Sequence, residues 1–209
     1  MIRSEPHERW LATALAMLAG YVDAVGFLAL GGFFVSFMSG NSTRAGVGLA
    51  LDPSAAIEAV EIIAVFVTGV VVGTVVRRRA RRPRATVIAM VSATLALAAA
   101  LGAGDDLRLV AVTMAFAMGL ENTVFERDGE VSISLTYMTG TLVRFGQRLA
   151  GAILGGDRVA WRPYLLLWTG LVAGASAGAT AHQRLGLGAV WIAAAVAGAL
   201  ALVAARREE

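Results

Sequence analysis

Apolar residues fill this chain in blocks of roughly 20, separated by short polar breaks. A helix of about 20 residues crosses the hydrocarbon core of a bilayer, so blocks of this length predict membrane-spanning helices. The eight blocks cover residues 10–30, 33–51, 55–76, 85–101, 107–125, 131–154, 161–181 and 186–205. Only 16% of the residues are charged and the mean hydropathy is +0.71. The sequence therefore predicts an all-α, polytopic integral membrane protein with a single membrane domain, residues 1–209, and excludes a disordered chain.

The arginines predict how the chain crosses the membrane. All 18 basic residues are Arg, and six of them lie in the loop 77–84 between two apolar blocks. If every block crosses, the arginines divide almost evenly between the two sides. If blocks 33–51 and 131–154 enter and return, 15 lie on one side and only 3, namely Arg44, Arg108 and Arg184, on the other. Because positive charge marks the cytoplasmic side, we expect six transmembrane helices, two re-entrant or broken segments, and both termini in the cytoplasm.

The sequence repeats itself at an offset of about 100 residues. Residues 20–25 align with 119–124, residues 37–46 with 137–146, and Thr68-Gly69 with Thr169-Gly170. The two repeats, approximately 10–102 and 107–205, each cross the membrane three times in this topology, so the second is inverted relative to the first. Inverted repeats with broken helices at their interface are a recurrent transporter plan, with the binding site near the midplane. Duplication is also a simple way to build a helix bundle.

Polar residues inside the first and fifth blocks are candidate site residues. Asp23 lies in the middle of an apolar block, where a carboxylate is costly unless it is paired or hydrated. Its repeat mate is Asn122, which follows Glu121. These residues are expected to hold a proton, a cation or part of a substrate, or else to form a hydrogen bond that fixes helix packing. Both interpretations stay open from the sequence.

Two polar segments inside the re-entrant blocks predict breaks near Gly40 and Gly140. Ser, Gly and Asn favour turns and caps over helix interiors, so we expect a half-helix starting at about Asn41. Free backbone N–H groups at such a start attract anions, and the arginine one turn later would add to that attraction. Close packing by small residues is the competing explanation. The candidate substrate- or ion-binding residues of these segments are Ser39, Gly40, Asn41, Arg44, Thr139, Gly140, Thr141 and Arg144.

Other features point to scaffold rather than chemistry. Gly170, Gly174 and Gly178 recur every four residues on one helix face, which predicts close helix packing. The sequence has no Cys, no Gly-x-Ser-x-Gly, no His-Glu-x-x-His and no phosphate-binding loop with Lys. The carboxylate pair Asp105-Asp106 is predicted to lie in a loop. We therefore predict no enzyme activity, no catalytic residue, no metal and no cofactor.

Several of these motifs resemble a known family, the bacterial YoaK-like membrane proteins, which carry a domain of unknown function. The resemblance lies in Gly20-Tyr21-Val22-Asp23-Ala24, in Phe37-Met38-Ser39-Gly40-Asn41, and in the run 119–150, especially Asp128-Gly129-Glu130-Val131-Ser132 and the segment 135–142. It covers about residues 10–205 and implies an inner-membrane protein with around six helices, often described as a transporter, without implying a substrate. Two positions depart from the family: Ser39 stands where Thr is frequent, and Glu121 stands where Gln is usual.

These features predict a small inner-membrane transporter or channel with a midplane polar site between the repeats, for an unidentified small molecule or ion. On this hypothesis Asp23, Asn41, Asn122 and Thr141 line one shared polar cavity. The alternative is a membrane assembly or regulatory protein without a translocation path, in which Asp23 is packed. The expected partners are the lipid bilayer and that small molecule or ion, but no nucleic acid, and the sequence leaves a homo-oligomer open.

Overall fold

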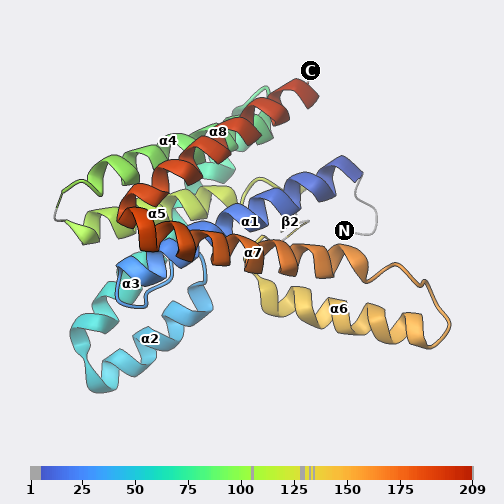
Figure 1. The fold of residues 1–209 in the computed structure, drawn as a ribbon, viewed down its shortest axis with the longest axis horizontal. Coiled ribbons are helices and arrows are strands. Elements are labelled where there is room, and N and C mark those ends of the chain that lie inside the picture. The colour runs from blue at the N-terminus through green and yellow to red at the C-terminus, as the bar shows by residue number, and fades with distance from the viewer. Residues whose placement is uncertain (1–5, 105, 128–129, 132, 134, 209) are drawn as a thin grey trace.

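The computed structural model of the chain describes residues 6–104, 106–127, 130–131, 133 and 135–208. Four residues named in the sequence analysis lie outside the described residues: Asp105, Asp128, Gly129 and Ser132. The described part is helical apart from one short hairpin (Figure 1). Its elements are α1 (Pro6–Ala29), α2 (Met38–Leu51), α3 (Pro53–Arg79), α4 (Pro83–Leu101), α5 (Leu107–Glu121), β1 (Glu126–Arg127), β2 (Glu130–Val131), α6 (Met138–Ile153), α7 (Arg162–Leu185), the 3₁₀ turn η1 (Gly186–Ala189) and α8 (Val190–Arg207).

Four stretches of the described chain are long and apolar enough to cross a membrane: Glu8–Ala29, Pro53–Arg79, Pro83–Leu101 and Arg162–Arg207. The last stretch has 46 residues, more than twice what one crossing needs. It contains both α7 and α8, and the chain reverses between them at Gly186, whose φ is +55°. The predicted all-α, polytopic membrane fold is thereby confirmed.

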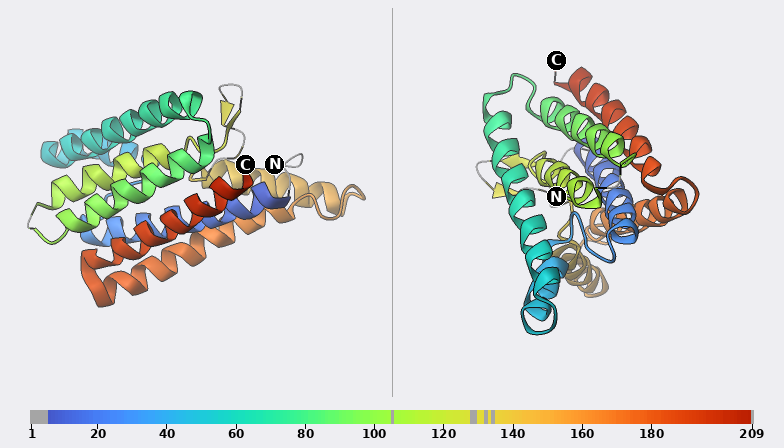
Figure 2. Two further views of the ribbon diagram at one scale, coloured as in Figure 1. Left: turned by 90° about the horizontal axis from the view of Figure 1, so that it is seen from above. Right: turned by 90° about the vertical axis from the view of Figure 1, so that its left-hand side faces the viewer.

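The long helices run together along the long axis of the molecule, while α2 and α6 project at opposite ends of it (Figures 1 and 2). The most extensive helix contacts are those of α1 with α7, α4 with α8, and α3 with α5. Each of these pairs joins a helix from the first half of the chain to one from the second. α2 packs on α3 as α6 packs on α7. The bundle is therefore built between the halves of the chain rather than within them.

Glycine allows α1 and α7 to touch backbone to backbone. A Cβ on Gly20 would overlap the carbonyl oxygen of Leu171, and a Cβ on Gly174 would overlap that of Met17. Gly178 meets the backbone of the next turn of α1 in the same way, and Gly170 faces Thr13 at 3.1–3.2 Å. The close packing predicted for these three α7 glycines is confirmed, because only small residues let helices approach this far.

The crossing of α3 with α5 repeats this arrangement. Gly119 faces the carbonyl oxygen of Phe66, and Gly69 faces that of Phe116. Gly69 is therefore equivalent to Gly174 of the crossing between α1 and α7. The sequence alignment of Thr68-Gly69 with Thr169-Gly170 is wrong by one helical turn. The physical reason is the preceding connection: only Asp52 separates α2 from α3, whereas residues 154–161 separate α6 from α7.

Charged groups tie several segments together at one end of the bundle. Arg77 donates hydrogen bonds to the backbone carbonyls of Val124 and Glu126, and Arg78 pairs with the Glu126 carboxylate at 3.1 Å. These contacts hold the end of α3 against the segment that follows α5.

A second set of contacts at this end fixes the start of α4. Arg84 pairs with Glu8 on α1. The backbone N–H groups of Arg84 and Ala85 donate to the two carboxylate oxygens of Glu208, each at 3.1 Å. The start of α1, the arginine loop and the end of α8 therefore lie at the same end of the molecule.

Candidate functional site

The segment between α1 and α2, residues 30–37, is the first break in the helical bundle. The chain reverses at Gly31 and Gly32, whose φ values are +62° and +90°. α2 then begins at Met38, so Gly40 lies in its first turn rather than at the break. The predicted break near Gly40 and half-helix from Asn41 are therefore placed too late in the sequence. The equivalent prediction at Gly140 is wrong in the same way, since α6 begins at Met138.

Asp23 holds the segment that leads into α2. Its Oδ1 accepts hydrogen bonds from the backbone N–H groups of Val35 at 2.8 Å and Ser36 at 2.9 Å. A carboxylate within a membrane helix usually has a partner that satisfies it. Here the partner is the backbone of the returning chain, which is thereby fixed beside α1.

Asn41 secures the same segment from the other side. Its side chain is fully buried, its Oδ1 accepts from the N–H of Phe34 at 3.1 Å, and its Nδ2 donates to the carbonyl of Phe34 at 2.6 Å. One amide side chain thus satisfies both backbone groups of a residue that has no helical partner. This explains why the chain breaks before α2 and not within it.

Arg44 also belongs to this segment. It donates to the carbonyl of Gly32 at 2.8 Å and to that of Gly31 at 3.3 Å, and its guanidinium lies 4.0 Å from the ring centroid of Phe33. Its repeat mate Arg144 is instead exposed on α6. The two arginines were predicted to attract anions in the same way beyond each break. In the structure, Arg44 instead holds the loop before α2 through its hydrogen bonds.

The second half of the chain uses Asn122 where the first uses Asp23. Asn122 Oδ1 accepts from Thr136 Oγ1 at 2.9 Å, and its Nδ2 donates to the carbonyl of Met118 at 2.9 Å. In each half, a side chain near the end of the first helix therefore holds the segment that leads into the second. Asp23 does so through backbone N–H groups and Asn122 through a hydroxyl.

The remaining candidates of the second segment take more local positions. Thr141 is buried and donates to the carbonyl of Tyr137 at 3.2 Å, within the first turn of α6. Gly140 packs against the ring of Tyr137, while Thr139, like Ser39 in the first half, is exposed.

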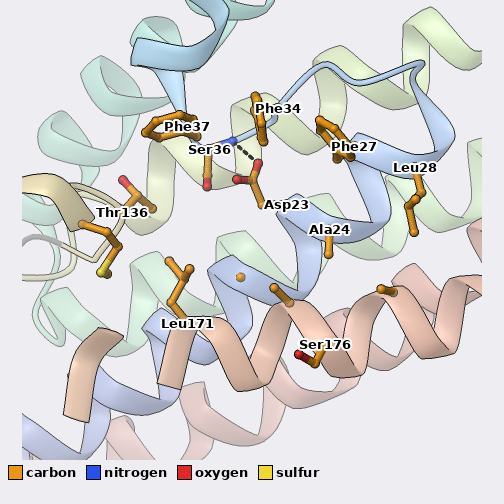
Figure 3. Close-up of a pocket in the computed structure, with 14 residues that line it drawn as sticks. Asp23, Ala24, Phe27, Leu28, Phe34, Ser36, Phe37, Thr136, Leu171 and Ser176 are labelled. Atoms are coloured by element: carbon orange, nitrogen blue, oxygen red, sulfur yellow. Dashed lines mark hydrogen bonds between the residues drawn. The ribbon is translucent and has the colours of Figure 1, made fainter. Parts of the chain in front are cut away.

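A cavity of about 590 Å³ lies between α1, α7 and the starts of α2 and α6 (Figure 3). Its polar lining is Asp23, Ser36, Thr136 and Ser176, and its apolar lining is Gly20, Ala24, Phe27, Leu28, Phe34, Phe37, Met138, Leu171, Ala175 and Ala179. Phe37 immediately precedes α2 and Met138 begins α6. The starts of both short helices therefore meet at one cavity beside Asp23.

The cavity brings together only part of the predicted set. Asp23 lines it, whereas Asn41, Asn122 and Thr141 do not, although Asn122 lies one hydrogen bond away through Thr136. Glu121 is fully buried at the end of α5 and is not among the lining residues. Sequence reasoning missed Ser36 and Thr136. The repeat could have found them, because they stand 100 residues apart, just before the aligned motifs 37–46 and 137–146.

Comparison with known proteins gives a family but no activity. Residues 11–203 match the family model described as "Protein of unknown function (DUF1275)". The UPF0700 transmembrane protein RA0705 of Rhizobium meliloti (strain 1021) is 38% identical over 182 residues, which cover 87% of this chain and 79% of that protein. The UPF0700 transmembrane protein YoaK of Bacillus subtilis (strain 168) is 28% identical over 154 residues, which cover 68% of each chain. No solved structure matches.

Proposed function

The chain belongs to the DUF1275 family of multi-pass membrane proteins, also named UPF0700, and on that premise we propose that it is a small-solute transporter or channel of the bacterial inner membrane. The observation that carries the proposal is the meeting of two short helices, one from each half of the chain, at a cavity that Asp23 lines. Irregular backbone at membrane depth is tolerated where it is buried in protein or lines a water-filled cavity.

The lining of the cavity indicates the class of solute. The starts of α2 and α6 bring the partial positive charge of the helix dipole, and Asp23 brings a carboxylate. The rest of the lining is mostly aliphatic and aromatic. A pocket of several hundred cubic ångströms with few polar groups fits a small molecule that combines an apolar body with a polar or zwitterionic end.

A six-span topology with two re-entrant segments supports this function. The ion pairs and hydrogen bonds of Arg84 with Glu8 and Glu208 place the start of α1, the arginine loop and the end of α8 at one end of the bundle. If this end of the bundle lies on one side of the membrane, six helices cross the membrane in alternating directions: α1, α3, α4, α5, α7 and α8. The short helices α2 and α6 return to the side from which they came. The arginine-rich end is cytoplasmic by the positive-inside rule.

The inverted-repeat interpretation, with halves 10–102 and 107–205, is supported by the two glycine crossings. α1 packs on α7 as α5 packs on α3, with the same pattern of glycine against carbonyl oxygen. Two halves related in this way allow the cavity to open alternately to either side of the membrane, as in other transporters built from inverted repeats.

A second candidate function is a membrane assembly or regulatory protein without a translocation path. The observation that favours it is the use of Asp23 Oδ1 by two backbone N–H groups, which gives this carboxylate a structural task. Enzyme activity is not part of the proposal, because among the described lining residues Asp23 alone is ionisable at neutral pH. A homo-oligomer stays a prediction.

The test is a ligand screen by thermal shift on the purified protein. We expect a small amphiphilic solute to raise the melting temperature of wild type but not of Asp23→Asn, which keeps the Oδ1 acceptor and removes the charge. Asp157→Asn is the matched control, since Asp157 is an exposed loop residue that accepts from the N–H of Val159. A solute that stabilises Asp23→Asn and a cavity-filling Ala175→Phe variant as much as wild type binds elsewhere and contradicts the proposal.

Vesicles then separate the two candidate functions. A solute that binds at Asp23 and is taken up by vesicles containing wild type supports transport. A solute that binds there and is not taken up favours the regulatory protein.

A further inference from the structure

Glu121 is the most unusual side chain in the described part of the chain. It is the last residue of α5, it is 0% exposed, and neither of its carboxyl oxygens has a hydrogen-bond partner among the residues that the structure describes. Buried polar atoms are almost always hydrogen-bonded, so each unpaired one needs an explanation. Packing does not supply one, since an apolar side chain would fill the same space without that penalty.

Among the described residues, no charged group pairs with Glu121. α5 packs against α3, α4 and α1. On α3, Arg77 donates to the carbonyls of Val124 and Glu126, and Glu61 pairs with Arg108 of α5 itself. On α4, Arg84 pairs with Glu8, and on α1 Asp23 accepts from the segment 30–37. An ionised carboxylate without water or a counter-charge is strongly disfavoured, so burial of this kind favours the neutral form of the acid.

Glu121 is also connected to the cavity. Asn122, its neighbour in sequence, accepts from Thr136 Oγ1, and Thr136 lines the cavity opposite α1 and α7. A change in the cavity that moves Thr136 therefore moves the end of α5. Two residues before Glu121, Gly119 lies against the backbone of α3, so displacement of α5 from α3 would change the packing beside Glu121.

We propose that Glu121 is the proton-binding site of a proton-coupled transport cycle, linked to the cavity through Asn122 and Thr136. This inference rests on the transport function proposed above and names its coupling ion. In the step itself, a proton from water binds one carboxylate oxygen of Glu121 when that residue is exposed. Closure of the crossing buries the neutral acid, and reopening toward the other side returns the same proton to water. No other bond changes.

The first measurement is infrared spectroscopy of the purified protein at neutral pH. Wild type is expected to show a protonated-carboxyl band that Glu121→Gln lacks and that exchanges slowly with deuterium. Glu58→Gln is the matched control, because Glu58 is a partly buried carboxyl on α3 that does not line the cavity, and this variant should keep the band. A wild-type spectrum without any band that Glu121→Gln removes would overturn the proposal.

The second measurement tests the link to the cavity. The chain has no Cys, so a single Ala175→Cys substitution places one thiol in the cavity lining. Its rate of alkylation by a small maleimide is measured against pH and divided by the rate for Asp157→Cys in the exposed loop, which removes the effect of thiol ionisation. We expect the ratio to change at least threefold with pH in the wild-type background and to be flat when Glu121→Gln is added.

A ratio that depends on pH equally in both backgrounds, or in neither, would contradict the link. If Glu121→Gln does not fold, Glu121→Met also removes the proton-binding carboxyl group and replaces it with an apolar side chain. Neither measurement needs a substrate. The proton site can therefore fail while the ligand screen succeeds, and the ligand screen can fail while the proton site stands.

Discussion

Gly174→Ala should destabilise the protein at the crossing of α1 with α7, and by more than the addition of one methyl group to a packed core usually does. The new Cβ would overlap the carbonyl oxygen of Met17 and would lie 2.7 Å from its carbonyl carbon and 2.9 Å from its Cα. Ordinary van der Waals contact begins at 3.4 Å, so the helices must separate by at least about 0.7 Å. A gap of 0.5–1 Å forfeits about a quarter to a half of each dispersion contact along the interface.

The clash is with backbone, which cannot turn away as a side chain can. Overpacking usually costs about 1–3 kcal/mol, and we expect Gly174→Ala at the upper end, about 3 kcal/mol. For a chain of this length that corresponds to a fall in melting temperature of about 6–12 °C. Differential scanning fluorimetry of the purified protein in one detergent would measure it.

Two further glycines provide a graded control. A Cβ on Gly170 would meet Thr13 at 3.1–3.2 Å, so Gly170→Ala should cost much less. A Cβ on Gly146, in the exposed part of α6, would meet nothing within 4 Å. Gly146→Ala should raise the melting temperature slightly, because Ala is favoured over Gly in a helix by about 1 kcal/mol. If Gly174→Ala and Gly146→Ala melt within about 2 °C of each other, the close crossing does not exist.

Three other predictions follow from the segments between helices. Asn41→Ala leaves the N–H and C=O of Phe34 unpaired and should cost about 2–6 kcal/mol, at about 1–3 kcal/mol for each buried group; an unchanged melting temperature would show that Asn41 does not hold the segment 30–37. Hydrogen bonds from Ser54 and Ala55 hold the pKa of Asp52 below its usual value of 3.8, so its stabilising effect is present above that value and is lost as the pH falls through the lowered pKa. Wild type should therefore lose stability relative to Asp52→Asn on acidification, and parallel pH profiles of the two melting temperatures would contradict this. Reporters fused after Glu209 and inserted in the loop 77–84 should both give cytoplasmic signals, and a periplasmic signal from either would contradict the six-span topology.

The sequence predicts the helices and the glycine contacts well because both depend on local patterns. Block length decides which segments span a bilayer, and the four-residue spacing of Gly170, Gly174 and Gly178 is a property of one helix face. The repeat also predicts that α2 and α6 are equivalent. These features need no knowledge of distant contacts.

The breaks and the cavity could not be placed in the same way. The segment 30–37 is stabilised by the Asn41 side chain and by Asp23, which stands 12 residues before Val35. Polar residues near Gly40 indicated a break, but their hydrogen bonds act on the preceding residues. The sequence alignment pairs Gly69 with Gly170, whereas the structure pairs it with Gly174, one turn later. This difference arises from loop length, which an ungapped comparison of the repeats ignores. Whether the predicted site residues bind a solute or ion stays a prediction.

The pairing of α1 with α7 has a consequence for how the protein is made. About 130 residues separate the end of α1 from the start of α7, which at about 5–20 residues per second is a delay of roughly 7–26 seconds. During that time α1 resides in the membrane without the helix that its glycine face fits. The same holds for α4, which waits for α8, and for α3, which waits for α5. Neither half of the chain can complete its structure during its own synthesis, so the ribosome has nearly finished before the first helix to be inserted acquires its permanent neighbour.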